Sequence, residues 1–232
     1  MNTPLPLLTI QESKNSKKNQ RTNRGCFIME QEFINRKIII SEAITDSLAG
    51  DVTAIILAIN DYDARMAQTF KNYEPEPIEM FINSGGGSAT AGNSIITAME
   101  MSDTPIITYG MGMIASMALA IFISGDIRIA SRLGRFMYHS VSYGAEGNIK
   151  DHEDSMREAN ILQELYNDIF LDKTKFTKGM MERIRDKKKD FFFSGKKAVK
   201  LGVADDILEK PEKKFELLTE EEVKELEKEI DL

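Results

Sequence analysis

A lone serine, Ser116, stands between small and flexible apolar residues, where a strand-like run gives way to a helix-like one. A serine hydroxyl becomes a useful nucleophile when a nearby base takes its proton. His139 ends a later strand-like run and is the candidate base, because an imidazole titrates near pH ~6.5 and can move protons at neutral pH. The pair predicts acyl-transfer chemistry of the serine-hydrolase kind.

Three consecutive glycines, Gly85 to Gly87, follow another strand-like run at 78–82. Without a Cβ, such residues let backbone N–H groups approach a ligand closely. In many hydrolases the N–H of the residue after the nucleophile works with a second donor from another loop. We therefore predict an oxyanion hole from Gly87 and Met117, with Gly86 beside the substrate. A tight turn without function is the alternative.

Four short motifs follow one another along the chain. They read Asn-Ser-Gly-Gly-Gly-Ser at 83–88, Gly-Met-Ile-Ala-Ser-Met-Ala at 112–118, Met-Tyr-His at 137–139 and Asp-Phe-Phe-Phe-Ser at 190–194, and Ala-Val-Lys-Leu-Gly-Val-Ala-Asp-Asp-Ile follows at 198–207. One such motif is weak evidence, whereas the ordered set is specific. In this respect the chain resembles the ClpP family, the proteolytic subunits of Clp proteases.

The resemblance implies further site residues. It places an acid that orients the histidine at Asp190, with Asp186 as the rival in the same charge-rich run. It places a flexible glycine-rich strand around Gly144, which would pair with extended substrate, although an ordinary loop is the alternative. Met113, Met117 and Met137 are candidates for a soft apolar specificity pocket, unless they simply belong to the core.

Four positions in three segments depart from the family pattern. Gly85 stands where proline is usual, and we expect a less rigid loop that keeps its N–H donors. Ser140-Val141 replace a common Gln-Pro and are expected to alter the substrate cleft. Glu79 lies where the strand that docks the family's unfoldase often carries an aromatic residue.

Strand-like and helix-like runs alternate, which predicts an α/β fold with right-handed crossovers. The expected strands are 34–40, 78–82, 106–109, 126–130 and 135–138, and the expected helices are 46–70, 89–101, 116–123 and 151–174. The resemblance narrows this to the ClpP/crotonase fold, a superhelical core of repeated β-β-α turns with a long protruding handle helix. The apolar spacing of 151–174 by itself favours a helix that packs one stripe on the core.

Three parts are expected along the chain. Residues 1–28 form a disordered tail, a propeptide or an untranslated stretch before Met29, because 11–25 contain no hydrophobic residue to bury. Residues 29–210 form the ClpP-like domain. Residues 211–232 form an acidic helical tail, in which Thr219 and Glu222 have the spacing of a capping box.

Composition narrows the class of protein. The net charge of −7 argues against nonspecific nucleic-acid binding, and no apolar run is long enough for a bilayer. One cysteine, Cys26, rules out an intrachain disulfide framework and fits the cytoplasm, or the host cytoplasm if a phage encodes the chain. Two histidines leave little room for a metal site, and we expect no cofactor.

The resemblance implies a serine endopeptidase that cleaves unfolded polypeptides or peptides through an acyl-enzyme. The chain would form a homo-oligomer of stacked rings and be fed by an AAA+ unfoldase, which would bind the ATP because no Gly-x-x-x-x-Gly-Lys-Ser/Thr occurs here. Two alternatives stay open: a phage-type head-maturation or scaffold-processing protease of this fold, and a non-proteolytic crotonase-like protein that binds acyl thioesters.

Overall fold

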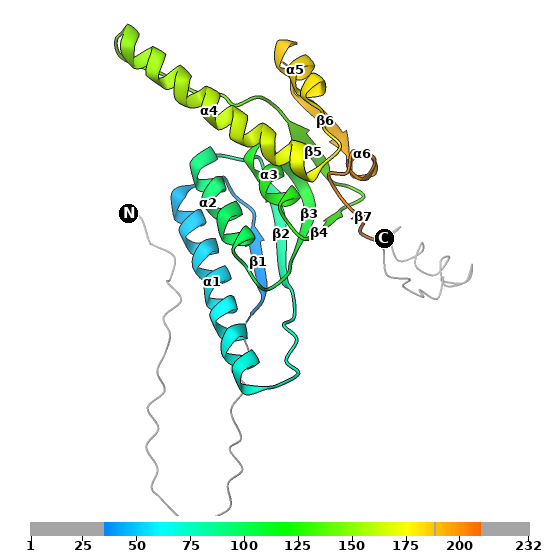
Figure 1. Cartoon of the computed structure of the whole chain (residues 1–232). Helices are drawn as coiled ribbons and strands as arrows, with labels where there is room; N and C mark the ends of the chain where they lie inside the picture. The colour runs from blue at the N-terminus through cyan, green and yellow to red at the C-terminus, as the bar shows by residue number, and fades with distance from the viewer. Residues whose placement is uncertain (1–34, 188, 210–232) are drawn as a thin grey trace, which may run out of the picture. The chain divides into compact units, whose positions relative to one another are not determined.

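The computed structural model describes residues 35–187 and 189–209 (Figure 1). The predictions for 1–28 and 211–232 lie outside the described residues. Within the described part, strands and helices alternate, which confirms the predicted α/β class. No helix there combines the length and the apolar character needed to cross a bilayer.

A sheet of seven described strands forms the centre of the fold (Figure 1). Its strands are β1 (Lys37–Ile40), β2 (Ile78–Ser84), β3 (Ile106–Ala115), β4 (Ile127–Ala130), β5 (Arg135–Tyr138), β6 (Phe191–Ser194) and β7 (Asp206–Ile207). The order β1-β2-β3-β4-β7 is parallel throughout. β5 runs parallel to the last part of β3, and β6 is antiparallel to β5.

Helices make the crossovers that parallel strands require. They are α1 (Asp46–Thr69), α2 (Ala89–Glu100), α3 (Met117–Ile123), α4 (Ile149–Lys173), α5 (Lys178–Asp186) and α6 (Gly195–Lys200). Side chains of Thr45, Ser88 and Asn148 cap α1, α2 and α4 by accepting backbone N–H bonds. Every residue of α3 is buried, so the segment after Ser116 is the centre of the core.

β3 is much longer than the predicted strand, which ended at Tyr109. Residues 107–110 pair with β4, and residues 113–115 then pair with β5. Glycines within a run weaken a strand prediction. In the structure, close packing requires the glycine at 110, because a Cβ on Gly110 would lie 3.0 Å from the ring of Phe136. The extended strand brings the ends of β3 and β5 together.

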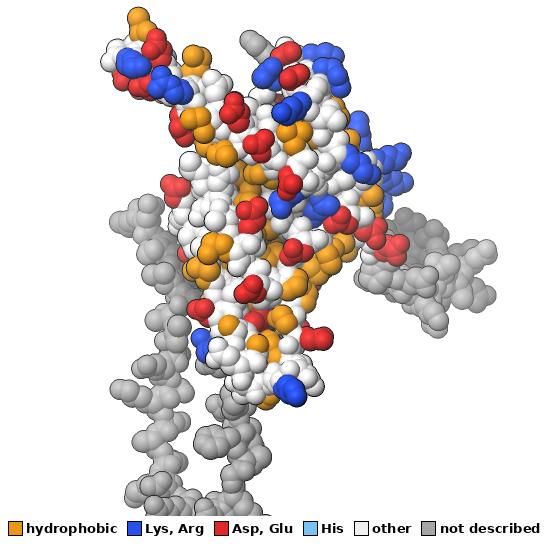
Figure 2. Space-filling model, in the orientation of Figure 1, with side chains coloured by type: hydrophobic (Ala, Val, Ile, Leu, Met, Phe, Trp, Pro, Cys, Tyr) orange, Lys and Arg blue, Asp and Glu red, His pale blue; other side chains and the backbone are white. Residues whose placement is uncertain are grey.

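The sequence predicted no element over 178–207, where the structure forms α5, β6, α6 and β7. Tertiary packing explains β6. Its Phe193 is buried and lies 5.7 Å from the ring of Phe136 on β5. Lys and Arg side chains gather over the α5 and α6 side of the molecule (Figure 2), and this charge hides the short apolar stretches from sequence patterns.

α4 carries its first half well beyond the sheet, as a handle would (Figure 1). Only Tyr166 and Phe170 of this helix are buried. Ile149 is 80% exposed and Met156 50%, and hydrophobic side chains are visible along the helix in Figure 2. The prediction that one continuous apolar stripe packs on the core is therefore wrong for the first half of α4.

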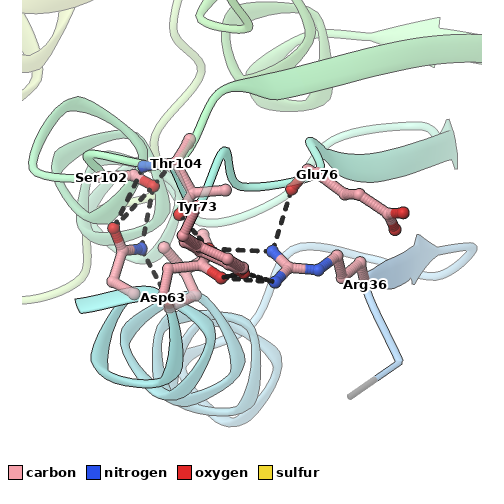
Figure 3. Close-up of polar contacts among 8 residues, drawn as sticks. Arg36, Asp63, Tyr73, Glu76, Ser102 and Thr104 are labelled. Carbon is pink, nitrogen blue, oxygen red and sulfur yellow. Dashed lines mark hydrogen bonds and ion pairs between the residues drawn. The ribbon is translucent and has the colours of Figure 1, made fainter. Parts of the chain in front are cut away.

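A polar cluster ties together the segments that precede β1, β2 and β3 (Figure 3). Arg36 contacts both carboxylate oxygens of Asp63 on α1, at 2.9 and 2.5 Å. The Tyr73 hydroxyl and the Thr104 hydroxyl donate to the same carboxylate, at 2.5 and 2.6 Å. Arg36 also donates to the carbonyl of Glu76. This cluster fixes α1 at the amino ends of the strands, opposite the predicted site.

Candidate active site

The predicted site residues follow the carboxyl ends of three strands. The glycine run follows β2, Ser116 follows β3 and His139 follows β5. In parallel sheets this edge is where ligands are bound, because the loops there converge. The parallel pairing of β2 with β3, and of β3 with β5, is what brings the three loops together.

Ser116 occupies a sharp turn between β3 and α3. Its φ of 54° and ψ of −129° make it the single non-glycine residue with positive φ among those described. Such strained conformations persist where the surroundings enforce them, and they cluster at functional sites. Here the Ser116 N–H donates to the carbonyl of Met137 at 2.9 Å. The predicted strand-to-helix turn is confirmed, although the helix begins at Met117.

Gly86 packs directly against the serine turn. A Cβ at this position would lie 2.7 Å from the Cβ of Ser116 and 3.0 Å from the N of Met117, and its φ is +98°. Gly87 is held at Ile44, which donates its N–H to Gly86 and accepts from Ser88. Within the described residues, the N–H groups of Gly87 and Met117 take part in no hydrogen bond. Two donors are thus available beside Ser116.

A cavity of about 420 Å³ opens at this turn. Five predicted site residues line it: Gly87, Ser116, Met117, His139 and Gly144. The remaining lining residues are Ser88, Ala89, Val141, Ser142, Tyr143, Ser155, Glu158, Ala159, Leu162 and Tyr166. Its wall is mixed, with hydroxyls and one carboxylate among apolar side chains.

Ser116 and His139 share the cavity without a hydrogen bond between them in the described part of the chain. Catalytic hydrogen bonds are often long before substrate arrives and tighten in the complex. The arrangement therefore offers a hydroxyl, an imidazole and two N–H donors around one space, which is the set that acyl transfer needs.

Asp190 does not line this cavity. It borders a different cleft, which it shares with Met180 and Phe191. However, the antiparallel register pairs Tyr138 with Phe191, so one further step along the ladder puts Asp190 opposite His139. The rival Asp186 ends α5, is 68% exposed and pairs with Arg185 at 3.3 Å. The backbone register thus favours Asp190 as the partner of His139.

Met113 lies outside the cavity. It belongs to the unpredicted part of β3, is 39% exposed and donates its N–H to the side chain of Asn83. The loop 139–147, which contains Gly144, forms no strand in this single chain. The predicted pairing of this segment with extended substrate stays a prediction.

Sequence patterns missed the contribution of α4. Its Ala159, Leu162 and Tyr166 face the cavity, whereas the spacing predicted only core contacts for this stripe. The i, i+3, i+7 spacing of these three residues does mark one helix face, but it cannot distinguish a cavity wall from a core.

Comparison with known proteins identifies the family of the chain. The family model described as Clp protease matches residues 20–211. The ATP-dependent Clp protease proteolytic subunit of Deinococcus radiodurans is 28% identical over 191 residues, which are 82% of this chain and 88% of that protein. The family match covers most of the chain and includes every motif described above, so the chain belongs to the Clp protease family.

Proposed function

We propose that this chain is a serine endopeptidase. Ser116 Oγ attacks the carbonyl of the scissile peptide bond while His139 takes its proton, and the oxyanion is received by the N–H groups of Gly87 and Met117. His139 then protonates the leaving amine, and water hydrolyses the acyl-enzyme by the same route in reverse. The observation that carries the proposal is the strained Ser116 turn, facing His139 across one cavity with two uncommitted N–H donors.

Asp190 is assigned as the acid that orients His139, supported by the β5–β6 register. Substrates are unfolded polypeptides or peptides, bound in extended form beside the 139–147 loop, where backbone pairing can add affinity. We further assign a chamber of stacked homo-oligomeric rings in the cytoplasm and an ATP-consuming unfoldase as partner. The name of the Deinococcus relative, an ATP-dependent proteolytic subunit, supports that partner.

A fluorophosphonate probe tests the nucleophile. Wild-type protein should be labelled at Ser116 and should hydrolyse a fluorogenic peptide, and Ser116→Ala should lose both properties. Ser194→Ala is the matched control, because Ser194 is exposed, lies opposite Arg135 at the other end of the β5–β6 pair and is outside the cavity, so this variant should keep both. Loss of a triad serine lowers kcat by roughly 10⁶. Labelling at another residue, or an active Ser116→Ala variant, contradicts the assignment.

The same assay separates the two acids. Asp190→Asn should lower kcat by about 10⁴, the cost of leaving the histidine in the wrong tautomer. Asp186→Asn should stay near wild type, since its carboxylate is exposed and bound to Arg185. The reverse ranking would transfer the role to Asp186.

A further inference from the structure

Three polar side chains lie on a single turn of α4. Gln163, Tyr166 and Asn167 are spaced i, i+3 and i+4, so they project from one face of the helix. Each of them forms hydrogen bonds to the segments that carry Ser116 and His139, or to one another. No other element in the described chain makes side-chain hydrogen bonds to both segments.

Tyr166 fixes the serine side. Its hydroxyl donates to the carbonyl of Ser116 at 3.1 Å, while its ring stacks on Tyr138 at 5.4 Å. The side chain is buried, and burial raises the pKa of the Tyr166 phenol well above its ordinary value, so the hydroxyl stays a donor. The bond therefore holds Ser116, the one non-glycine residue with positive φ among the residues that the structure describes.

Gln163 and Asn167 fix the histidine from both sides. The Tyr138 hydroxyl donates to Asn167 Oδ1 at 2.6 Å, just before His139. The Val141 N–H donates to Gln163 Oε1 at 2.7 Å, two residues after it. Gln163 Nε2 donates in turn to Asn167 Oδ1 at 2.8 Å, which links the two anchors. His139 thus sits on a short span tied down at each end to the same helical turn.

We propose that Gln163, Tyr166 and Asn167 are positioning residues that set the distance between Ser116 and His139. The inference rests on the proposed function, because that distance matters only if the two residues react together. A displacement of about 1 Å between reacting groups can cost 10²-fold in rate. A rigid helical turn that binds both segments prevents this displacement.

Near-isosteric substitutions test the proposal in the full-length chain. Tyr166→Phe keeps the stacked ring and removes only the bond to Ser116. Gln163→Met keeps the side-chain length and removes the acceptor for Val141, whereas Gln163→Glu keeps an acceptor oxygen. The exposed Asp168→Asn, on the same turn, is the control. Fluorophosphonate titration counts the active sites, so that kcat is expressed per labelled site, and KM is measured alongside.

We expect kcat per site to fall about tenfold in Tyr166→Phe and about 10- to 100-fold in Gln163→Met, with KM little changed, as for mispositioned reacting groups. Gln163→Glu keeps the acceptor for Val141 but cannot donate to Asn167, so it should recover only part of the loss, and Asp168→Asn should match wild type. A fall in the number of labelled sites with unchanged kcat per site would show a purely structural role and overturn the proposal. Wild-type protein that is never labelled at Ser116 would instead refute the proposed function.

Discussion

At the scale of residues, the site depends on glycines that differ sharply in what surrounds them. Gly86 has no room for a side chain, because a Cβ would meet Ser116, the carbonyl of Ala115 and the N of Met117 within 3.0 Å. A Cβ on the neighbouring Gly85 would have no atom within 4 Å. The family commonly places proline at the roomy position, which fits this geometry.

Gly86→Ala should therefore inactivate the enzyme. The new methyl group, together with the unfavourable φ of +98°, must displace the Ser116 turn or the loop itself. We expect fluorophosphonate labelling of Ser116 to fall by at least about 10²-fold in rate, as for a 1 Å misplacement.

Gly85→Ala is the matched control. It should label normally and be more stable by about 0.4–1 kcal/mol, since alanine reduces the entropy of the unfolded chain. Urea unfolding measures this difference. Equal effects of the two substitutions would mean that the loop moves freely relative to Ser116.

At the scale of elements, sequence patterns predicted most of the central fold and failed where tertiary contacts decide. The predicted helix from Asp46 was confirmed almost to the residue, because a cap and a regular apolar face define it locally. The predicted strand ended at Tyr109, whereas β3 continues to Ala115. Its pairing with β5 over residues 113–115 is a tertiary contact that leaves no signal in the local sequence. The turn at Ser116 was predictable from its small neighbours, whereas the contacts made by α4 depend on how the helix docks.

The exposed apolar side chains of α4 are the surface on which we expect the proposed assembly to form. Ile161 is 45% exposed and Leu165 48%, although both are large and apolar. Such residues on one protruding helix are typical of an interaction surface. We expect Ile161→Glu to shift the protein to smaller species in analytical ultracentrifugation at micromolar concentration.

Asn160→Glu, at the adjacent exposed position, adds the same charge and should leave the assembly unchanged. A wild-type monomer that still cleaves peptides would contradict the chamber model. Dissociation by both variants would point to charge repulsion rather than to loss of an apolar contact.

At the scale of the whole molecule, the Arg36–Asp63 cluster and the loops of the candidate site lie at opposite ends of the same strands. Burial alone would raise the pKa of Asp63, but hydrogen bonds from Arg36, Thr104 and Tyr73 outweigh it and hold that pKa below its ordinary value. Burial and the bond to Asp63 raise the pKa of Tyr73 to about 12. The cluster is therefore fully charged and bonded at neutral pH.

Asp63→Asn should destabilise the fold at pH 7 by about 3–5 kcal/mol, because it leaves Arg36 largely buried without its counter-charge. The carboxylate stabilises the fold above its unfolded pKa of ~3.9, and this contribution disappears as pH falls through the lower folded value. The stability gap between variant and wild type in urea unfolding should thus narrow below about pH 4. The exposed Asp186→Asn should show no gap, and a constant gap for Asp63→Asn would contradict the charge argument.

The first half of α4 makes few core contacts, so it depends on its own backbone hydrogen bonds, its cap and its surface ion pairs. Asn148 and Asp151 form its capping box, and Asp154 pairs with Lys150 at 3.3 Å and with Arg157 at 3.2 Å. Exposed pairs of this kind contribute only about 0.3–0.5 kcal/mol each and are screened by ions. In a single chain we therefore expect rising ionic strength to destabilise the first turns of α4, near Ile149, before the rest of the helix. The turn that contains the buried Tyr166 should stay folded.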